Sequence, residues 1–267
     1  MKRRSSVAAR QLVILCIAVG SLAAQTSFAP TAPLPPEIVL LARIKQHAVE
    51  TLTKQPNYTC VESIERGRRN RQALDFRIDD NLRFEVAWID GKELFAPPGA
   101  KRFDEKDIRE LVPTGAVSSG DFALHAHTVF ASTVPTYEAR GEEKLGPRAA
   151  VRYDYRVPRL FSGYSIRIRS AEAVVGYHGS FWVDPVSLDL ERLDVIPDEL
   201  PPELGLRSAF QRIEYARFPI GGTDFLLPAS SEMALIHTDG SATRNRVQFT
   251  SCREYAGRSV VRFDDPQ

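Results

Sequence analysis

The stretch Ala116-Val117-Ser118-Ser119-Gly120 comes closer to a catalytic motif than the other serine-containing segments, because it resembles a degenerate nucleophile elbow. That motif presents a serine for acyl transfer on a sharp turn between a strand and a helix, within an alternating α/β pattern. Here proline and glycine precede the serines, and the surrounding sequence does not alternate in that way. A helix cap is therefore the simpler interpretation of Ser118 or Ser119.

His125 and His127 form a His-x-His pair. On a strand both rings would point to the same side and share a metal ion, whereas on a helix they point about 200° apart. Two histidines alone also make an incomplete site. The sequence therefore predicts no metal site, and His47, His178 and His237 are interpreted as isolated polar residues.

Asp184, Asp189 and Glu191 are candidates for a pair of carboxylates in acid–base catalysis. Asp184 has a turn to form, and the other two alternate with leucines, so we expect them to face water. The sequence also has no phosphate loop, dinucleotide fingerprint, His-Glu-x-x-His or Cys-x-x-Cys motif. These observations predict a protein that is not an enzyme and uses no cofactor.

The first 23 residues have the layout of a secretory signal peptide, in which basic residues precede a short apolar run and small residues follow it. The run from 12 to 19 is shorter than the roughly 20 residues that span a bilayer. Residues 24–34 are proline-rich and aperiodic, which is typical of a disordered leader. We expect an exported protein, periplasmic or secreted, without an integral membrane span in the mature chain.

The chain has 267 residues, with 35 basic and 34 acidic side chains, and four of the basic ones lie in the predicted signal peptide. The mature chain is therefore slightly acidic, which argues against a general nucleic-acid binder. Cys16 lies in the signal peptide, so Cys60 and Cys252 remain. An even pair of cysteines in an exported protein favours a disulfide. Two buried free thiols are the alternative.

A helix is predicted from Pro36 to Thr53, because apolar residues recur there at helical spacing and Pro35-Pro36-Glu37 suits a first turn. A strand follows at 58–65, and the basic "RGRRNR" after it is interpreted as a solvated hairpin tip. Asp90-Gly91 between two alternating runs predicts a hairpin with a primed turn.

The middle of the chain predicts two short helices, one over "FDEKDIREL" and one over "GDFALHAHTVF", with a strand as the alternative for the second. From Tyr137 onward, alternating runs predict consecutive antiparallel strands. "SFWVDPVSLDLERLDV" (180–195) predicts a hairpin that turns at Asp184-Pro185, with a bulge between Leu190 and Leu193.

That hairpin is similar to the W-[IV]-D-P-x-[ST] segment of outer-membrane lipoprotein-sorting (LolA-like) proteins. The longer run "YTCVESIER … VRYDYRVP … GSFWVDP … LLP … FTSCREY" also resembles a group of secreted bacterial proteins. The resemblance implies an α+β, mostly β fold, in which a curved antiparallel sheet forms an open half-barrel. An N-terminal amphipathic helix and short helices inserted mid-chain would cover its concave side, in a single domain spanning 35–264. The gating arginine of those carriers cannot be assigned to a residue of this sequence.

Carriers of this kind hold acyl chains between the sheet and the helices. The resemblance thus implies a soluble protein that binds a lipid, a lipoprotein acyl chain or another hydrophobic ligand on the concave face. A non-catalytic envelope module that binds a protein partner is the alternative, and a hydrolase on an unfamiliar scaffold is the third possibility. The side chains expected to line the ligand site are Ile38, Leu41, Ile44, Tyr153, Tyr155, Phe181 and Val183.

Overall fold

The computed structural model describes residues 33–100, 102–103, 108–112, 114–117, 120–168 and 170–255. The predicted signal peptide, most of the predicted leader and the serines at 118 and 119 lie outside the described residues. The chain divides into two compact units, Met1–Leu34 and Pro35–Gln267, and the second holds every helix and strand named below.

The helices are α1 (Pro36–Lys54), α2 (Ile108–Leu111), α3 (Leu124–Ala131), α4 (Arg159–Ser162) and the 3₁₀ turn η1 (Pro202–Leu204). The strands are β1 (Tyr58–Arg69), β2 (Arg77–Ile89), β3 (Lys92–Ala96), β4 (Thr136–Leu145), β5 (Arg148–Val157), β6 (Ser165–Ile168), β7 (Ala171–Val174), β8 (Tyr177–Val183), β9 (Leu190–Pro197), β10 (Leu206–Ile220), β11 (Thr223–His237) and β12 (Ala242–Glu254).

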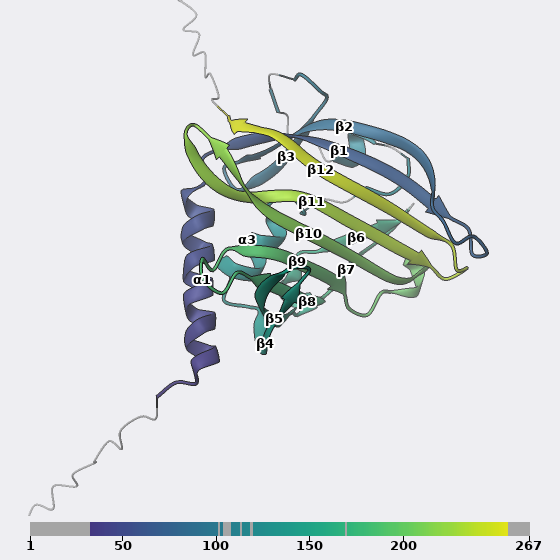
Figure 1. The fold of residues 1–267 in the computed structure, drawn as a ribbon. Helices are drawn as coiled ribbons and strands as arrows, with labels where there is room; N and C mark the ends of the chain where they lie inside the picture. Colours follow the sequence, from purple (N-terminus) through teal and green to yellow (C-terminus); the bar gives the residue numbers. More distant parts are fainter. Residues whose placement is uncertain are drawn as a thin grey trace, which may run out of the picture. The chain divides into compact units, whose positions relative to one another are not determined.

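Ten strands form one antiparallel sheet in the order β3-β2-β1-β12-β11-β10-β9-β8-β5-β4, and β6 and β7 form a separate ribbon. The long strands arch along their length, and the sheet is not closed into a barrel (Figure 1). The pairing of β1 with β12 brings the first and last strands together in the middle of the sheet. The predicted fold class, a mostly β chain with an open curved sheet and a few helices, is confirmed.

The N-terminal helix is confirmed as α1, with Pro36 in its first turn and Gln55 as its extended C-cap. Proline suits the first turn because its missing N–H has no partner there in any case. Pro56 then disfavours helical geometry for the residue before it, which ends the helix. Among the described residues, no helix is both apolar enough and long enough to cross a membrane.

Two predicted hairpins are confirmed. Asp90 and Gly91 have φ values of 50° and 78°, as a primed turn requires, and they join β2 to β3. In the β8–β9 hairpin the Asp184 carboxylate accepts the N–H groups of Val186 and Ser187, at 2.8 and 2.7 Å. The predicted bulge is also present, because Trp182 pairs with Arg192 whereas Val183 pairs with Leu190.

The interpretation of "RGRRNR" as a solvated hairpin tip holds only for Asn70 and Arg71, which are exposed between β1 and β2, and is wrong for 66–69, because β1 continues through Arg69. Arg66 is 9% exposed, and its guanidinium donates to the two carboxylate oxygens of Asp80 on β2 and to the Thr114 carbonyl. This pairing lets a basic residue stay within the strand, since the charge is neutralised and its donors are used. The second mid-chain segment is a helix, α3, rather than a strand.

Candidate functional site

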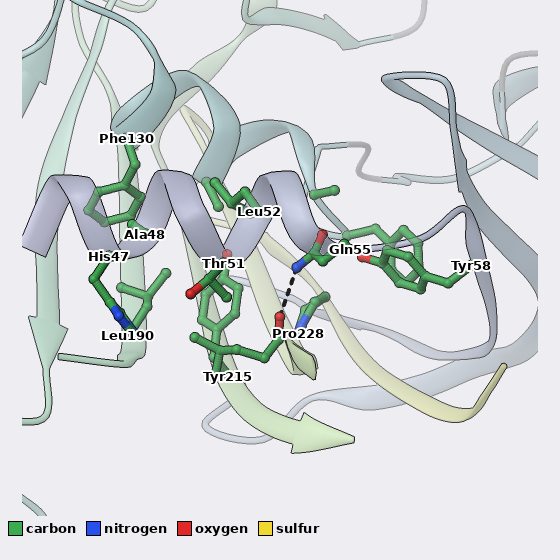
Figure 2. A pocket seen from close by; sticks show the side chains of 14 residues that line it. His47, Ala48, Thr51, Leu52, Gln55, Tyr58, Phe130, Leu190, Tyr215 and Pro228 are labelled. Atoms are coloured by element: carbon green, nitrogen blue, oxygen red, sulfur yellow. Dashed lines mark hydrogen bonds between the residues drawn. The ribbon is translucent and has the colours of Figure 1, made fainter. Parts of the chain in front are cut away.

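A narrow pocket lies between the C-terminal half of α1 and the sheet (Figure 2). The cavity itself has a volume of about 30 Å³, and all the space between its walls, open mouth included, amounts to about 430 Å³. The lining comes from α1, from the segment leading into and through α3, and from strands β1, β9, β10 and β11. The lining residues are His47, Ala48, Thr51, Leu52, Gln55, Tyr58, Phe122, Ala123, Ala126, Phe130, Leu190, Tyr215, Leu226 and Pro228.

Most of this lining is apolar, and the small side chain of Ala48 keeps α1 from filling the space. Phe130 and Leu190 belong both to the pocket wall and to the core cluster under α1. An apolar cavity with a few polar groups is the usual form of a site for a small hydrophobic ligand.

Three polar atoms of the pocket residues are buried without a hydrogen-bond partner: the hydroxyls of Tyr58 and Tyr215 and Oε1 of Gln55. The Gln55 amide is fixed in place because Nε2 donates to the Leu226 carbonyl at 2.9 Å. Burial raises the pKa of Tyr58 well above its usual value, and the Glu93 carboxylate adds to the shift. Burial, followed by the charges of Asp121 and Glu93, likewise raises the pKa of Tyr215. Both phenols therefore stay protonated and able to donate.

A set of buried acids lies on the side of the pocket nearest β1 and α3. Glu93 accepts the N–H groups of Gly120, Ala123 and Leu124 at 2.7, 2.8 and 3.0 Å, which satisfies the donors at the start of α3. Glu62 is 1% exposed, and burial, with the nearby Asp121 charge second, raises its pKa well above the usual value. The shifts show that a further negative charge is disfavoured at this end of the pocket.

His47 marks the opposite end of the pocket. Its Nε2 lies 2.9 Å from Asp189 Oδ1, and Arg217 contacts the same carboxylate through Nε and Nη2 at 2.7 and 2.8 Å. The interpretation of His47 as an isolated residue is therefore wrong, as it is for His178, whose Nδ1 lies 2.6 Å from Asp198 Oδ1. His47, Asp189 and Arg217 tie α1 to β10 and to the turn before β9.

The expectation that Asp189 and Glu191 face water is also wrong. The Asp189 side chain is 14% exposed under His47 and Arg217, and Glu191 is 6% exposed and pairs with Arg148 at 2.7 Å. The bulge at Glu191 shifts the phase of the strand, so alternation with the leucines no longer reports which face a side chain occupies.

The two histidines of the His-x-His pair point to different neighbours. His125 is 4% exposed and packs edge-on against Tyr164 at 5.2 Å, whereas the His127 ring stacks on Trp88 at 4.6 Å. Burial lowers the pKa of His125 to about 4, so it is neutral at pH 7. Within the described ranges, no group of three or more potential ligands is spaced to hold a metal ion.

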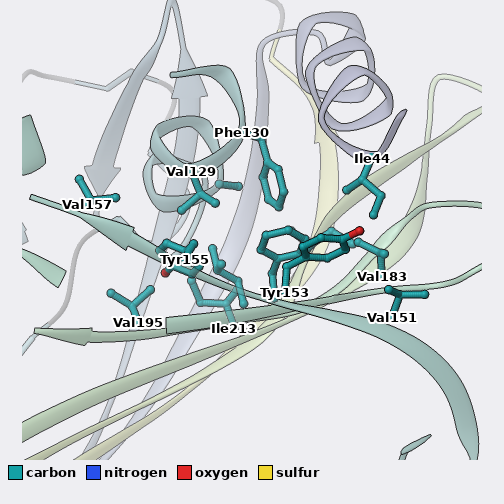
Figure 3. Close-up of a cluster of buried hydrophobic side chains, with 14 of the residues drawn as sticks. Ile44, Val129, Phe130, Val151, Tyr153, Tyr155, Val157, Val183, Val195 and Ile213 are labelled. Atoms are coloured by element: carbon teal, nitrogen blue, oxygen red, sulfur yellow. The ribbon is translucent and has the colours of Figure 1, made fainter. Parts of the chain in front are cut away.

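Most side chains predicted to line the ligand site lie beside the pocket, in the core cluster under α1 (Figure 3). Tyr153, Tyr155, Phe181 and Val183 are at most 3% exposed, and Ile44 of α1 is fully buried against them. The Tyr153 and Phe181 rings stack at 5.5 Å. Side chains therefore fill this space.

The other two predicted residues lie nearer the start of α1. Leu41 is partly buried and packs against the same cluster, whereas Ile38 is 48% exposed. The structure thus brings six of the seven predicted residues together and leaves Ile38 apart.

Sequence reasoning missed the polar residues of the pocket. Tyr215 shares strand alternation with the buried Gln211 and Ile213, which was a signal that it faces inward. No local pattern marks Gln55 or Tyr58 as pocket residues, because their unsatisfied atoms depend on segments far away in the sequence.

The predicted disulfide is present. Cys60 of β1 is bonded to Cys252 of β12, with Cα atoms 4.0 Å apart and a sequence separation of 192 residues. Cys60 is fully buried in a second core cluster, which also contains Tyr58, Phe122 and Phe249.

Among solved structures, the chain is similar to NE2245, a LolA superfamily protein from Nitrosomonas europaea. The identity is 12%, the match covers 83% of this chain and 94% of that chain, and the TM-score is 0.42. The chain is also similar to a DUF1329 family protein from Desulfovibrio piger, with 13% identity, coverage of 82% and 95%, and a TM-score of 0.43. No protein-family model and no curated protein matches the chain.

Proposed function

We propose that the protein is an exported, non-catalytic binding protein that holds a hydrophobic ligand, such as a lipid or acyl chain, in the pocket between α1 and strands β9–β11. The observation that carries the proposal is the apolar pocket itself, which leads from the aromatic core cluster under α1 to two buried tyrosine hydroxyls. The layout of the first 23 residues and the disulfide both support export to an oxidising compartment.

The energetics suit reversible binding. Each methylene moved out of water contributes roughly 0.8 kcal/mol, so six or seven methylenes contribute about 5 kcal/mol before ordering costs. Such a contribution lets a carrier both take up and release its cargo. The second half of α1 is held by the polar contacts of His47 and Gln55 and by the packing of Ala48 and Leu52. In this proposal α1 moves away from the sheet and widens the pocket when the ligand enters.

Filling the pocket tests the proposal. In the variant Ala48→Phe a benzyl group occupies the space under α1, so we expect binding of the hydrocarbon fluorophore diphenylhexatriene to weaken at least about ten-fold. Ala42→Phe is the matched control, because Ala42 lies on the same helix but is exposed, and its binding should equal that of the wild type.

Circular dichroism and thermal unfolding establish that each variant is folded. If Ala48→Phe does not fold, Thr51→Phe places the same ring nearer the mouth, where Thr51 is only half-buried. An absence of saturable binding by the wild type, or equal binding by the filled variant, argues against a ligand in this pocket. Mass spectrometry of lipids extracted from the native protein then identifies the cargo.

A further inference from the structure

The polar end of the pocket carries a second inference, which rests on the proposed function and narrows its ligand. We propose that this end selects an amphiphile with an uncharged hydrogen-bonding head group, such as a hydroxyl or an ester, and rejects a carboxylate on the same chain. The ligand class is then a neutral lipid rather than a free fatty-acid anion.

Two buried hydroxyl groups in the pocket wall have no hydrogen-bond partner. Tyr58 is fully buried, and its hydroxyl has no partner, as is also true of the Tyr215 hydroxyl. Buried polar groups in folded proteins nearly always have partners, so an unsatisfied pair in the wall of a pocket marks a place for a ligand's polar atom. Both phenols line the same pocket as Gln55.

The third unsatisfied atom fixes what kind of head group fits. Gln55 Oε1 is a carbonyl oxygen and can only accept a hydrogen bond, and the amide is held in this orientation because its Nε2 donates to the Leu226 carbonyl. A hydroxyl head group can donate to Gln55 and accept from a phenol, and an ester carbonyl can accept from a phenol. A carboxylate has no hydrogen to give to Gln55.

The charges around these atoms are acidic. Glu93, which accepts three backbone N–H groups, raises the pKa of both phenols after burial, and Asp121 raises that of Tyr215. A carboxylate placed against the phenols meets the same repulsion in a buried site, where charges are poorly screened.

Three of the cations around α1 have partners of their own. Arg217 makes a two-point contact with Asp189, and His47 contacts the same carboxylate. Lys45 donates to the Ser132 carbonyl and lies over the Tyr137 ring. None of these side chains offers a free positive charge to an anionic head group at Tyr58.

The opposite end of the pocket accepts the chain of such a ligand. Ala48, Leu52, Phe130 and Leu190 supply an apolar wall that continues into the core cluster under α1. The pocket therefore has the two ends that an amphiphile needs, with His47 and Leu190 at one end and Gln55 and Tyr58 at the other (Figure 2).

Competition experiments test this inference on the full-length exported protein. Bound diphenylhexatriene is displaced by 1-dodecanol, methyl dodecanoate or dodecanoate at pH 8, each below its aggregation threshold. We expect dodecanoate to compete at least about ten-fold less well than dodecanol, because a buried site built for a hydroxyl discriminates strongly. The ester should behave like the alcohol, since it has the same chain without the charge.

Two variants connect the selectivity to named atoms. Tyr58→Phe and Tyr215→Phe each remove one hydroxyl, and we expect each to weaken dodecanol about five-fold relative to diphenylhexatriene measured on the same variant. Tyr137→Phe is the control, because the Tyr137 hydroxyl donates to the Val129 carbonyl and does not line the pocket.

Equal or better competition by dodecanoate, or selectivity that survives in both tyrosine variants, overturns the head-group inference and leaves the hydrophobic pocket intact. Failure of diphenylhexatriene itself to bind overturns the proposed function, and the head-group inference with it. The two failures are thus distinguishable in one experiment.

Discussion

Two halves of the sheet are closed in different ways. The disulfide half, around β1, β2, β3 and β12, is linked by Cys60–Cys252, and Glu93 fixes the segment that covers it. The helix half, around β5, β8, β9 and β10, is covered by α1 and α3 over stacked aromatic rings. Contacts through His47 and Gln55 hold the second half of α1.

The pocket lies where these two halves meet. Tyr58 comes from the disulfide half, whereas Ala48, Thr51 and Leu52 come from α1. One wall is fixed by a covalent bond and buried acids, whereas the other depends on an amphipathic helix held by the polar contacts of His47 and Gln55 and by the packing of Ala48 and Leu52. In the proposed binding mode, the helix wall opens and the polar wall stays rigid.

Removal of the disulfide is expected to have the largest effect. The double variant Cys60→Ala/Cys252→Ala frees a loop of 192 residues, and the chain-entropy model predicts a loss of about 5 kcal/mol in unfolding free energy as an upper value. Urea unfolding measures this loss. The control is wild-type protein with its disulfide reduced, because it lacks the bond but keeps both cysteine side chains. A loss below about 1 kcal/mol would show that packing and strand pairing alone fix this half.

Acid is expected to have the next largest effect, through His125 of α3. In the unfolded chain a histidine binds a proton below about pH 6.5, whereas burial lowers the pKa of folded His125 to about 4. Neutral His125 therefore makes its full contribution to the unfolding free energy above pH 6.5. This contribution of about 3 kcal/mol is lost as the pH falls to 4.

The variant His125→Leu isolates this contribution. Burial raises the pKa of Glu62 and Glu93, so these carboxyls favour the folded state in acid and act in the opposite direction. The difference in unfolding free energy between wild type and His125→Leu should therefore shrink as the pH falls from 7 to 4. A difference that does not change with pH would contradict a buried neutral His125.

The smallest effect on stability is expected at the mouth of the pocket. Asp189→Asn removes the charge that His47 and Arg217 share, and partly exposed pairs of this kind contribute about 1 kcal/mol or less. We nevertheless expect faster dissociation of diphenylhexatriene in stopped-flow experiments, because α1 loses a contact to β10. The control Glu50→Gln removes an exposed ion pair within α1 at 3.8 Å and should not change the rate. Equal rates for Asp189→Asn and the wild type would indicate that the ligand enters without movement of α1.

Much of the fold could be predicted because its signals are local. The turn at Asp90-Gly91, the turn at Asp184 and the bulge before Leu193 follow from conformations that these few residues favour. The helical spacing of apolar residues in α1 is local in the same sense. The candidate site was harder to predict, because the residues expected to line it form a filled cluster beside the pocket.

The sequence by itself determined the helix, the strand alternation and the cysteine pair, since periodicity and cysteine count do not depend on which segments later meet. Only the tertiary structure decided that His47 contacts Asp189, 142 residues away, and that the hydroxyls of Tyr58 and Tyr215 are buried without a partner. The physical reason is that the burial of a polar group depends on the segments that cover it. In this protein α1 crosses over strands far from it in the sequence, so neither their contacts nor the pocket between them has a local signature.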